Sequence, residues 1–205
     1  MTTTRTHDLV RLADPSAVLI GTEPAWVAES LAGAPWAVVR RGTAPDGQVA
    51  VGVRGPARHQ RHAALVPTHA VQRVVRPEQL RPGRDASADR TPALAALRAI
   101  GPTLDGLGHD WGPVGSVGFE LATGRPTTTP ASDLDVVVRC DPLPGADWAA
   151  ELLDTFPALP ARVDCLIETT AGAVALAELA TGADRVLLRT AGGACLADPA
   201  RIRAP

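Results

Sequence analysis

The amino-acid sequence predicts an α/β (α+β) protein with a smaller α+β domain at its N-terminal end. The C-terminal half alternates helical and strand-like segments three times, an order typical of a sheet flanked by helices. The N-terminal part instead contains short apolar runs separated by turn residues. Between the two, residues 76–90 are rich in proline and charge, which indicates a linker. We therefore expect a basic N-terminal domain at residues 1–78, a linker at 79–90 and a C-terminal domain at 91–205.

In the N-terminal domain, strands are expected at residues 8–12, 37–41 and 48–54, and helices at residues 25–33 and 57–66. The second helix is predicted because a proline precedes it at the position that favours a helix start. Helical spacing would place Arg58 and Arg61 on one face of it. Together with Arg40, Arg41 and Arg54, these arginines are the best phosphate-binding candidates of the domain. A solvated helix face is the alternative interpretation.

In the C-terminal domain, helices are expected at residues 92–101, 147–156 and 171–180, and strands at 133–139, 162–168 and 185–190. Thr91 is expected to cap the first helix, and the Gly101-Pro102 pair to end it. The strand at 185–190 is expected to be the last element. Residues 117–121 fit either a helix or a strand.

Composition excludes two classes of chemistry. All twenty basic residues are arginine, so a Walker phosphate loop and Schiff-base catalysis, which both need lysine, are ruled out. Phosphate would have to be bound by arginine side chains and backbone amides. Three widely spaced cysteines without a CxxC pattern indicate neither a disulfide framework nor structural zinc. Without a signal-peptide or membrane-spanning apolar segment, the protein is expected to be cytoplasmic, with no membrane partner.

The net charge of −2 hides an asymmetry along the chain. Residues 1–90 carry twelve arginines and eight acidic residues, a balance of +4, whereas residues 91–205 carry eight and fourteen, a balance of −6. A basic and an acidic domain would suit a polyanionic substrate held together with metal ions. A simple drift of surface charge along the chain is the alternative.

Two aspartates stand at the start of a valine-rich segment. Asp133 and Asp135 are separated by one residue and followed by three valines, which predicts a buried strand that delivers both carboxylates to one face. Such a pair needs a cation between its members, most often a divalent metal. Asp164, on the next predicted strand, is the expected third acid, with Glu168 on the same face as the alternative. Aspartates that merely begin a strand are the competing interpretation.

A Gly-Ser pair precedes these acids. The hydroxyl of Ser116 and the amides of a tight turn could anchor phosphate oxygens, and Gly115 would allow their close approach. Arg125 and Arg189 are further candidate phosphate contacts. Acids on neighbouring strands beside a phosphate-binding turn suit phosphoryl or nucleotidyl transfer with two metal ions.

The order Gly115-Ser116, Asp133-Leu134-Asp135, Asp164 resembles the pattern of the nucleotidyltransferase superfamily. Longer stretches resemble one narrow family, the malonate decarboxylase holo-acyl-carrier-protein synthases, or phosphoribosyl-dephospho-CoA transferases. These stretches are WGPVGSVGFELATG, SDLDVVVR, VDCLIETTAGAVALAELA and VLLRT, with HDL, VVRR and VGVRGPARHQR in the N-terminal half. The sixteen residues between the Gly-Ser pair and the first aspartate are more than many nucleotidyltransferases have.

The resemblance implies a nucleotidyltransferase-like mixed sheet flanked by helices and a specific reaction. Such enzymes join the phosphoribosyl end of 2′-(5″-triphosphoribosyl)-3′-dephospho-CoA to a serine of the acyl carrier protein subunit of malonate decarboxylase, releasing diphosphate. Asp133 and Asp135 would bind two Mg²⁺ ions, with Mn²⁺ as an alternative, and Asp164 would complete one site and help to deprotonate the serine. Ser116 and nearby amides would hold the β- and γ-phosphates.

Other functions remain open at this point. The acceptor could be the citrate lyase carrier protein, an RNA or a small molecule, or the chain could be a non-catalytic binding module of the same fold. The 3% aromatic content and the acidic C-terminal half argue against a nucleic acid partner. The intact acids and Gly-Ser pair argue against a module without activity. An acidic carrier protein would be expected to dock on the N-terminal arginines, such as Arg58 and Arg61.

Overall fold

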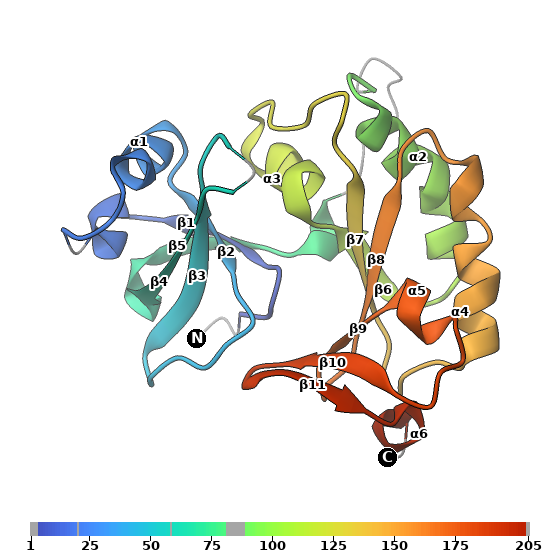
Figure 1. Cartoon of the computed structure of the whole chain (residues 1–205). Helices are drawn as coiled ribbons and strands as arrows, with labels where there is room; N and C mark the ends of the chain where they lie inside the picture. Colours follow the sequence, from blue (N-terminus) through green and yellow to red (C-terminus); the bar gives the residue numbers. More distant parts are fainter. Residues whose placement is uncertain (1–3, 20, 58, 81–88, 204–205) are drawn as a thin grey trace. The chain divides into compact units, whose positions relative to one another are not determined.

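The computed structural model of the chain describes residues 4–19, 21–57, 59–80 and 89–203 (Figure 1). The chain divides into two compact units, Met1–Arg76 and Pro77–Pro205. Each unit contains one sheet and several helices. The predicted mixture of helices and strands is therefore confirmed. None of the helices in the described residues has the length and apolar character needed to cross a membrane.

The first unit is a five-stranded antiparallel sheet with the order β4-β3-β2-β1-β5. Its strands are β1 (Leu9–Leu12), β2 (Trp36–Val39), β3 (Gln48–Arg54), β4 (Arg61–Pro67) and β5 (Val71–Val75), and its helices are α1 (Ala25–Gly33), η1 (Pro15–Val18) and η2 (Thr68–Ala70). Helix α1 buries Val27 and Leu31 in a core with Val51 and Val53 of β3. Burying these aliphatic side chains on one face of the sheet is what stabilises the unit.

The helix predicted at residues 57–66 is wrong, because this segment contains most of strand β4. The amide of Gly55 donates to the carbonyl of Gln60 (3.0 Å), and the Gln60 side chain accepts from the amide of Ala57 (2.9 Å). This tight connection turns the chain back, so that β4 pairs with β3 along its whole length. Pairing with the preceding strand therefore overrides the helix-start signal of the proline. Arg61 begins strand β4 and therefore does not lie on a helical face. Arg58, expected on the same face, lies outside the described residues.

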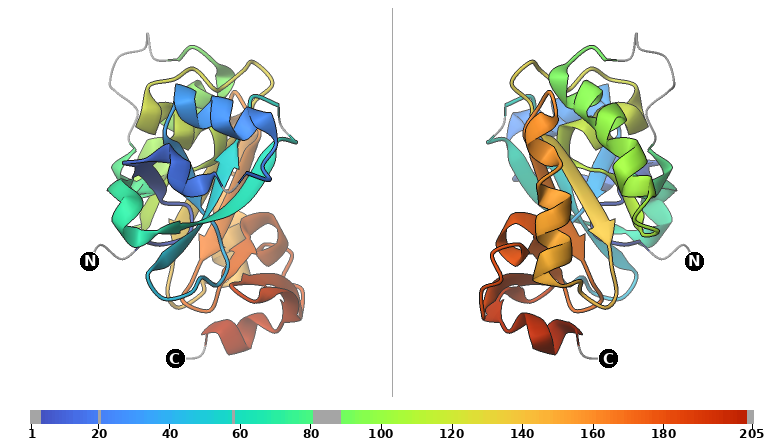
Figure 2. Two further views of the ribbon diagram at one scale, coloured as in Figure 1. Left: turned by 90° about the vertical axis from the view of Figure 1, so that its left-hand side faces the viewer. Right: turned by 90° about the vertical axis from the view of Figure 1, so that its right-hand side faces the viewer.

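The second unit is a six-stranded mixed sheet with the order β11-β10-β9-β8-β7-β6. The strands are β6 (Asp110–Pro113), β7 (Leu134–Arg139), β8 (Val163–Glu168), β9 (Ala173–Ala175), β10 (Val186–Thr190) and β11 (Gly193–Ala197). Among the described strands, β7 and β8 form the one parallel pair. Helices α2 (Pro92–Asp105), α4 (Ala146–Leu153) and α5 (Leu176–Leu179) cover one face, and α3 (Gly115–Thr123) lies on the other side of β7 (Figures 1 and 2).

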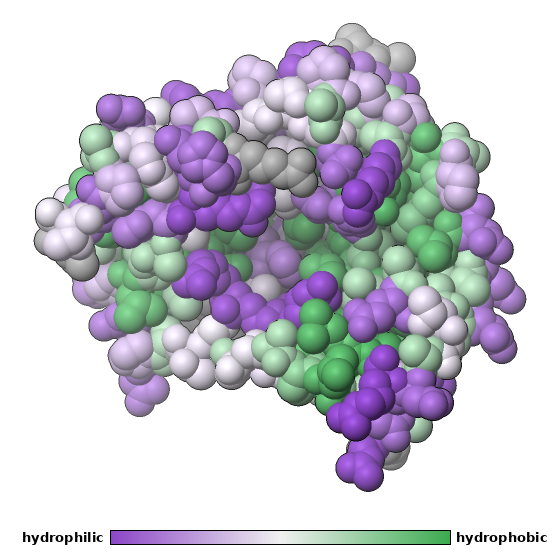
Figure 3. All heavy atoms as spheres, viewed as in Figure 1, coloured by the Kyte–Doolittle hydropathy of each residue, from purple (hydrophilic) through white to green (hydrophobic). Residues whose placement is uncertain are grey.

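Several elements of this unit differ from the prediction. Helix α2 continues through Pro102 to Asp105, because it buries Ile100 and Leu104 on its core face. Strand β6 lies in a segment for which no strand was predicted. Residues 171–180 form β9 and the four-residue helix α5 instead of one helix, and β11 and α6 (Pro199–Arg203) follow the strand expected to be last. Over β10 and β11 the surface is hydrophobic (Figure 3), and Leu196 of β11 is 58% exposed.

The described ends of the predicted linker pack on the second unit. The short helix η3 (Pro77–Gln79) lies so close to β6 that a Cβ on Gly112 would overlap the Pro77 carbonyl. Leu80 is buried, and the Glu78 carboxylate accepts a hydrogen bond from Arg139 of β7 (2.5 Å). The charged composition of this segment did not indicate these contacts.

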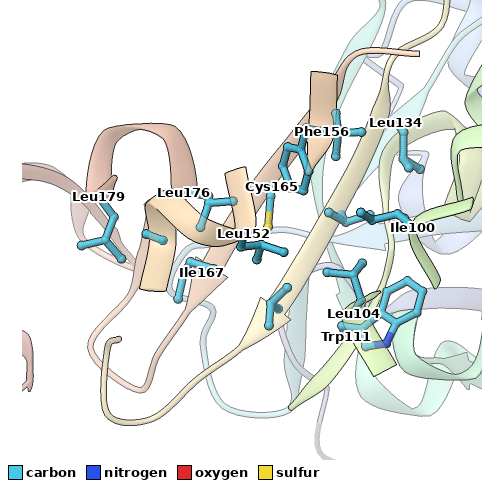
Figure 4. Packing of buried hydrophobic residues seen from close by; sticks show 14 of the residues in the cluster. Ile100, Leu104, Trp111, Leu134, Leu152, Phe156, Cys165, Ile167, Leu176 and Leu179 are labelled. Carbon is cyan, nitrogen blue, oxygen red and sulfur yellow. The ribbon is translucent and has the colours of Figure 1, made fainter. Parts of the chain in front are cut away.

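Alternation along β7 and β8 separates a hydrophobic face from a polar one. Leu134, Val136 and Val138 of β7 and every second residue of β8, beginning at Val163, join the core beneath α2 and α4. Figure 4 shows Cys165 and Ile167 of β8 in this core, packed with side chains of α4 and α5. The residues between them point to the opposite face. That second face carries the acidic residues singled out by the sequence.

Candidate active site

Helix α3 begins directly against the carboxylate of Asp135. Gly115, its first residue, has φ +61°, and a Cβ at this position would overlap the Asp135 side chain. Glycine is therefore needed twice, for its backbone conformation and for the close approach. The segment 117–121, for which the sequence allowed a helix or a strand, is helical.

The start of α3 is suited to an anion. The first amides of a helix have no partner within the helix and carry its positive partial charge. The residue before the helix is Val114, whose aliphatic side chain cannot accept a hydrogen bond from these amides. Gly115 and Ser116 are both half-buried, so a phosphate group could reach their backbone. This arrangement fits the phosphate-binding turn expected from the Gly-Ser pair.

Strands β7 and β8 bring two aspartates together. Asp135 and Asp164 are partners in the parallel register, so their Cα atoms are about 4.8 Å apart and both side chains lie on the face away from the core. Asp133 is half-buried and directly precedes β7. Glu168, the alternative third acid, lies four residues further along β8, about 13 Å from Asp164. The geometry therefore favours Asp164 over Glu168 as the neighbour of Asp135.

Arg162 lies directly before β8 and contacts the acidic residues. Its guanidinium Nη2 donates to Oδ1 of Asp164 at 2.8 Å. The hydrogen bond to Asp164 and the negative charges of Asp164, Asp133 and Asp135 together raise the pKa of Arg162 above its ordinary value. No role was assigned to this arginine from the sequence, although it stands two residues before Asp164, a spacing that places both side chains on one face of a strand.

Glu120 of α3 anchors, through hydrogen bonds, the loop that leads to Asp133. Its Oε2 accepts hydrogen bonds from the amides of Thr127 (2.8 Å) and Thr128 (2.7 Å), and Arg90 donates to both of its oxygens. Burial would raise the pKa of Glu120, but the bonds from Arg90, Thr128 and Thr127 outweigh this and lower it. The Thr127 hydroxyl also donates to the Ser116 carbonyl (2.9 Å). These hydrogen bonds hold the loop against α3 at Ser116 and at Glu120.

The carboxylates fit a divalent cation only in part. Their oxygens are the ligands that Mg²⁺ prefers. Within the described part of the chain, however, no three His, Cys, Asp or Glu side chains lie close enough together to hold a metal ion. Asp164 is in addition held in an ion pair with Arg162. Asp133 and Asp135 would thus hold a cation first, and Asp164 would join once it leaves Arg162.

The predicted arginines are spread over both units. Arg54 and Arg61 belong to the first unit, where they are partners at the end of the β3–β4 hairpin. Arg125 is exposed in the loop after α3, and its amide donates to the Thr123 hydroxyl (3.2 Å). Arg189 of β10 stands in register with Ala173, which pairs with Glu168, so it lies level with the far end of β8 from Asp164. It is not part of the carboxylate cluster.

The cysteines take no part in this site. Cys140 and Cys165 are buried, and burial raises the pKa of Cys140 to about 11 and also raises that of Cys165. Both therefore remain protonated at neutral pH and serve as small core side chains, as the sequence indicated. Cys195 is exposed on β11.

Comparison with known proteins identifies the family of this chain. Residues 79–200 match the family described as phosphoribosyl-dephospho-CoA transferase MdcG C-terminal domain, and residues 5–77 match the corresponding MdcG N-terminal domain. The chain belongs to the phosphoribosyl-dephospho-CoA transferase family. The family and the transferase class predicted from the sequence are therefore confirmed.

Relatives match along nearly the whole chain. A phosphoribosyl-dephospho-CoA transferase of Azotobacter vinelandii is 46% identical over 87% of this chain and 86% of its own length. Two from Pseudomonas putida are 42% identical (strain W619), over 97% of this chain and 96% of the relative, and 43% identical over the full length of both chains. No solved structure matches the chain.

Proposed function

We propose that this chain transfers phosphoribosyl-dephospho-CoA from 2′-(5″-triphosphoribosyl)-3′-dephospho-CoA to a serine of the malonate decarboxylase acyl carrier protein, with release of diphosphate. The name of its relatives supports the transferred group. The observation that carries the chemistry is the position of Asp135, held against the start of α3 beside Asp164. Acids and the first amides of a helix at one point suit a polyphosphate donor. The carrier protein, its serine and the diphosphate rest on the sequence resemblance.

The acids would hold the divalent cations of the reaction. Asp133 and Asp135 would bind Mg²⁺, or Mn²⁺ in its place, and Asp164 would complete the set after leaving Arg162. When bound, two such ions neutralise charge on the phosphates and lower the effective pKa of an attacking hydroxyl.

The remaining steps fall to the chain's own groups. The first amides of α3 and the Ser116 hydroxyl would hold the β- and γ-phosphates and orient the triphosphate. The acceptor serine oxygen would bond to the α-phosphorus, and the bond from that phosphorus to the bridging oxygen would break to release diphosphate. The serine proton would pass to a carboxylate oxygen of Asp164. The loop anchored by Glu120 would keep Asp133 in place throughout.

Mass spectrometry of the carrier protein tests this function. The recombinant apo carrier subunit is incubated with this protein, Mg²⁺ and the triphosphoribosyl donor, and a mass increase equal to one prosthetic group is expected. A carrier with alanine in place of its acceptor serine is the matched control and should gain nothing. The citrate lyase carrier protein, tested in parallel, separates the two acceptors. Transfer to that carrier alone, or no transfer with either, would contradict the proposal.

A further inference from the structure

We propose that Arg162 is a built-in cation of the carboxylate site, which a divalent metal ion displaces and which then binds the phosphates of the donor. This inference rests on the proposed function, because it concerns the same cation site. It assigns to Arg162 two successive partners, Asp164 before metal binding and a phosphate oxygen afterwards.

The contacts of Arg162 support the first partner. Its guanidinium donates to Oδ1 of Asp164 at 2.8 Å. Asp164 is the partner of Asp135 in the parallel register, and Asp133 precedes Asp135 by two residues, so this positive group lies at the edge of the sheet that carries all three acids proposed to bind metal. A guanidinium in that position satisfies the carboxylates in the way that a metal ion would.

The exposure of the pair shows that the bond can open. The Arg162 side chain is 71% exposed and that of Asp164 is 48% exposed. Exposed ion pairs of this kind are weak and screened by salt. A doubly charged ion that Asp133 and Asp135 attract would therefore compete successfully for Asp164.

The position of Arg162 supports the second partner. Its own carbonyl accepts the amide of Leu134 at 2.9 Å, which fixes its backbone between the starts of β7 and β8. A guanidinium released from Asp164 would remain tethered beside the carboxylates. Its planar fork matches the geometry of phosphate oxygens, and it would face the donor that the metal ions bring in.

Binding of Mn²⁺ and of inorganic diphosphate to the full-length protein tests the exchange. R162Q removes the competing charge, so it should bind Mn²⁺ about 3- to 10-fold more tightly than the unchanged protein, less so at high salt. With Mn²⁺ saturating, it should bind diphosphate about 10-fold more weakly. R201Q is the matched control: Arg201 is also an exposed arginine paired with an aspartate, Asp198, and its loss should alter neither affinity.

The possible results separate the inference from the proposed function. If the unchanged protein binds Mn²⁺ and R162Q binds it no more tightly, or if R162Q keeps its diphosphate affinity, the exchange is overturned while the cation site stands. If the unchanged protein binds no Mn²⁺, the proposed cation site falls and the exchange with it. R162K should bind Mn²⁺ like the unchanged protein, because it keeps the charge; tighter binding by R162K would also contradict the exchange.

Discussion

Both units contain neighbouring strands that place like charges opposite each other. Asp135 faces Asp164 across β7 and β8, whereas Arg54 faces Arg61 across β3 and β4. Like charges directly opposite destabilise a sheet. Their surroundings differ, however. The acidic pair has a helix start and a counter-ion built around it, while the arginine pair stands at the end of a hairpin.

The difference in surroundings indicates which of the two charged pairs is better arranged to bind a ligand. At the acidic pair, glycine is required where α3 meets Asp135, and Arg162 balances the negative charge. At the arginine pair, Arg61 is exposed at the start of an edge strand. The acids thus form a preorganised site, whereas the arginines form a surface that can attract an anion. Substitutions in both regions test this contrast.

The largest effect on this contrast is expected for Gly115→Ala. The added methyl group would overlap the Asp135 carboxylate, and the positive φ would cost about 1–2 kcal/mol. We expect transfer to fall by at least about 100-fold, since a displacement of about 1 Å in a catalytic group can cost that much. Turnover with the carrier protein and urea unfolding measure the two consequences.

Gly124→Ala is the matched control on the same helix. Gly124 has φ +70°, but among the described residues no atom lies within 4 Å of the position that an added methyl group would take, so only the backbone cost applies. It should lose about 1–2 kcal/mol of stability and keep its turnover. Equal losses of activity in both variants would show that the contact with Asp135 has no special importance.

A smaller effect is expected for Arg61→Glu on the arginine surface. The substitution reverses one charge of the Arg54–Arg61 pair, so binding of the carrier protein or the donor should weaken about 10-fold, with strong salt dependence. Stability should rise by about 0.2–1 kcal/mol, because a like-charge pair becomes an opposite-charge pair. Titration of each partner at two salt concentrations gives the affinities.

Arg73→Glu supplies the control for charge alone. Arg73 faces Arg11 across β5 and β1 in the same unit, so reversing its charge changes the unit's net charge equally. It should leave both affinities within about twofold of the unchanged protein if position matters. Unchanged binding in Arg61→Glu would remove the hairpin arginines from the binding surface.

Glu120→Gln weakens the anchor of the loop before Asp133 and is expected to act on stability, with the smallest effect on ligand binding. We expect a loss of about 1–2 kcal/mol at neutral pH, because a charged acceptor of several hydrogen bonds becomes neutral. Since folding lowers the pKa of Glu120 below its ordinary 4.5, its stabilisation is fully present above that pH. It is lost as the pH falls through the lowered pKa.

The difference in unfolding free energy between the unchanged protein and Glu120→Gln should therefore shrink below about pH 4.5. Urea unfolding at a series of pH values measures it. Glu151→Gln, on the exposed side of α4, should show no difference at any pH if the anchor is specific. If the difference in unfolding free energy between Glu120→Gln and the unchanged protein stays constant across the acid range, the charge of Glu120 does not stabilise the loop.

The sequence predicted the candidate site better than the elements around it. Asp133, Asp135 and Asp164 follow a spacing rule, because alternation along a strand and register between parallel neighbours put them on one face. The helix prediction at residues 57–66 failed because this segment forms a hairpin with β3, and a proline that suits the start of a helix does not reveal that pairing. Strands β6 and β11 were also missed, and each pairs at an edge of the sheet.

Most contacts of the supporting residues could not be predicted from the sequence. Glu120 meets Arg90 thirty positions away and Thr128 eight positions away, so no short motif connects them. Arg162 stands two residues before Asp164, so strand alternation alone would place both side chains on one face, but only the pairing of β7 with β8 brings Arg162 near Asp133 and Asp135. Motifs therefore indicated the candidate site residues, and the fold was needed to show most of the contacts around them.

The turnover of Asp135→Asn with the triphosphoribosyl donor and the carrier protein tests the central claim most directly. The amide keeps the shape of the side chain but loses the charge that would hold a metal ion. We expect transfer to fall to background while thermal unfolding stays within a few degrees of the unchanged protein, and Asp133→Asn to behave alike. Asp184→Asn, at an exposed position away from this cluster, is the control and should retain full turnover. Near-normal turnover of Asp135→Asn would contradict the account.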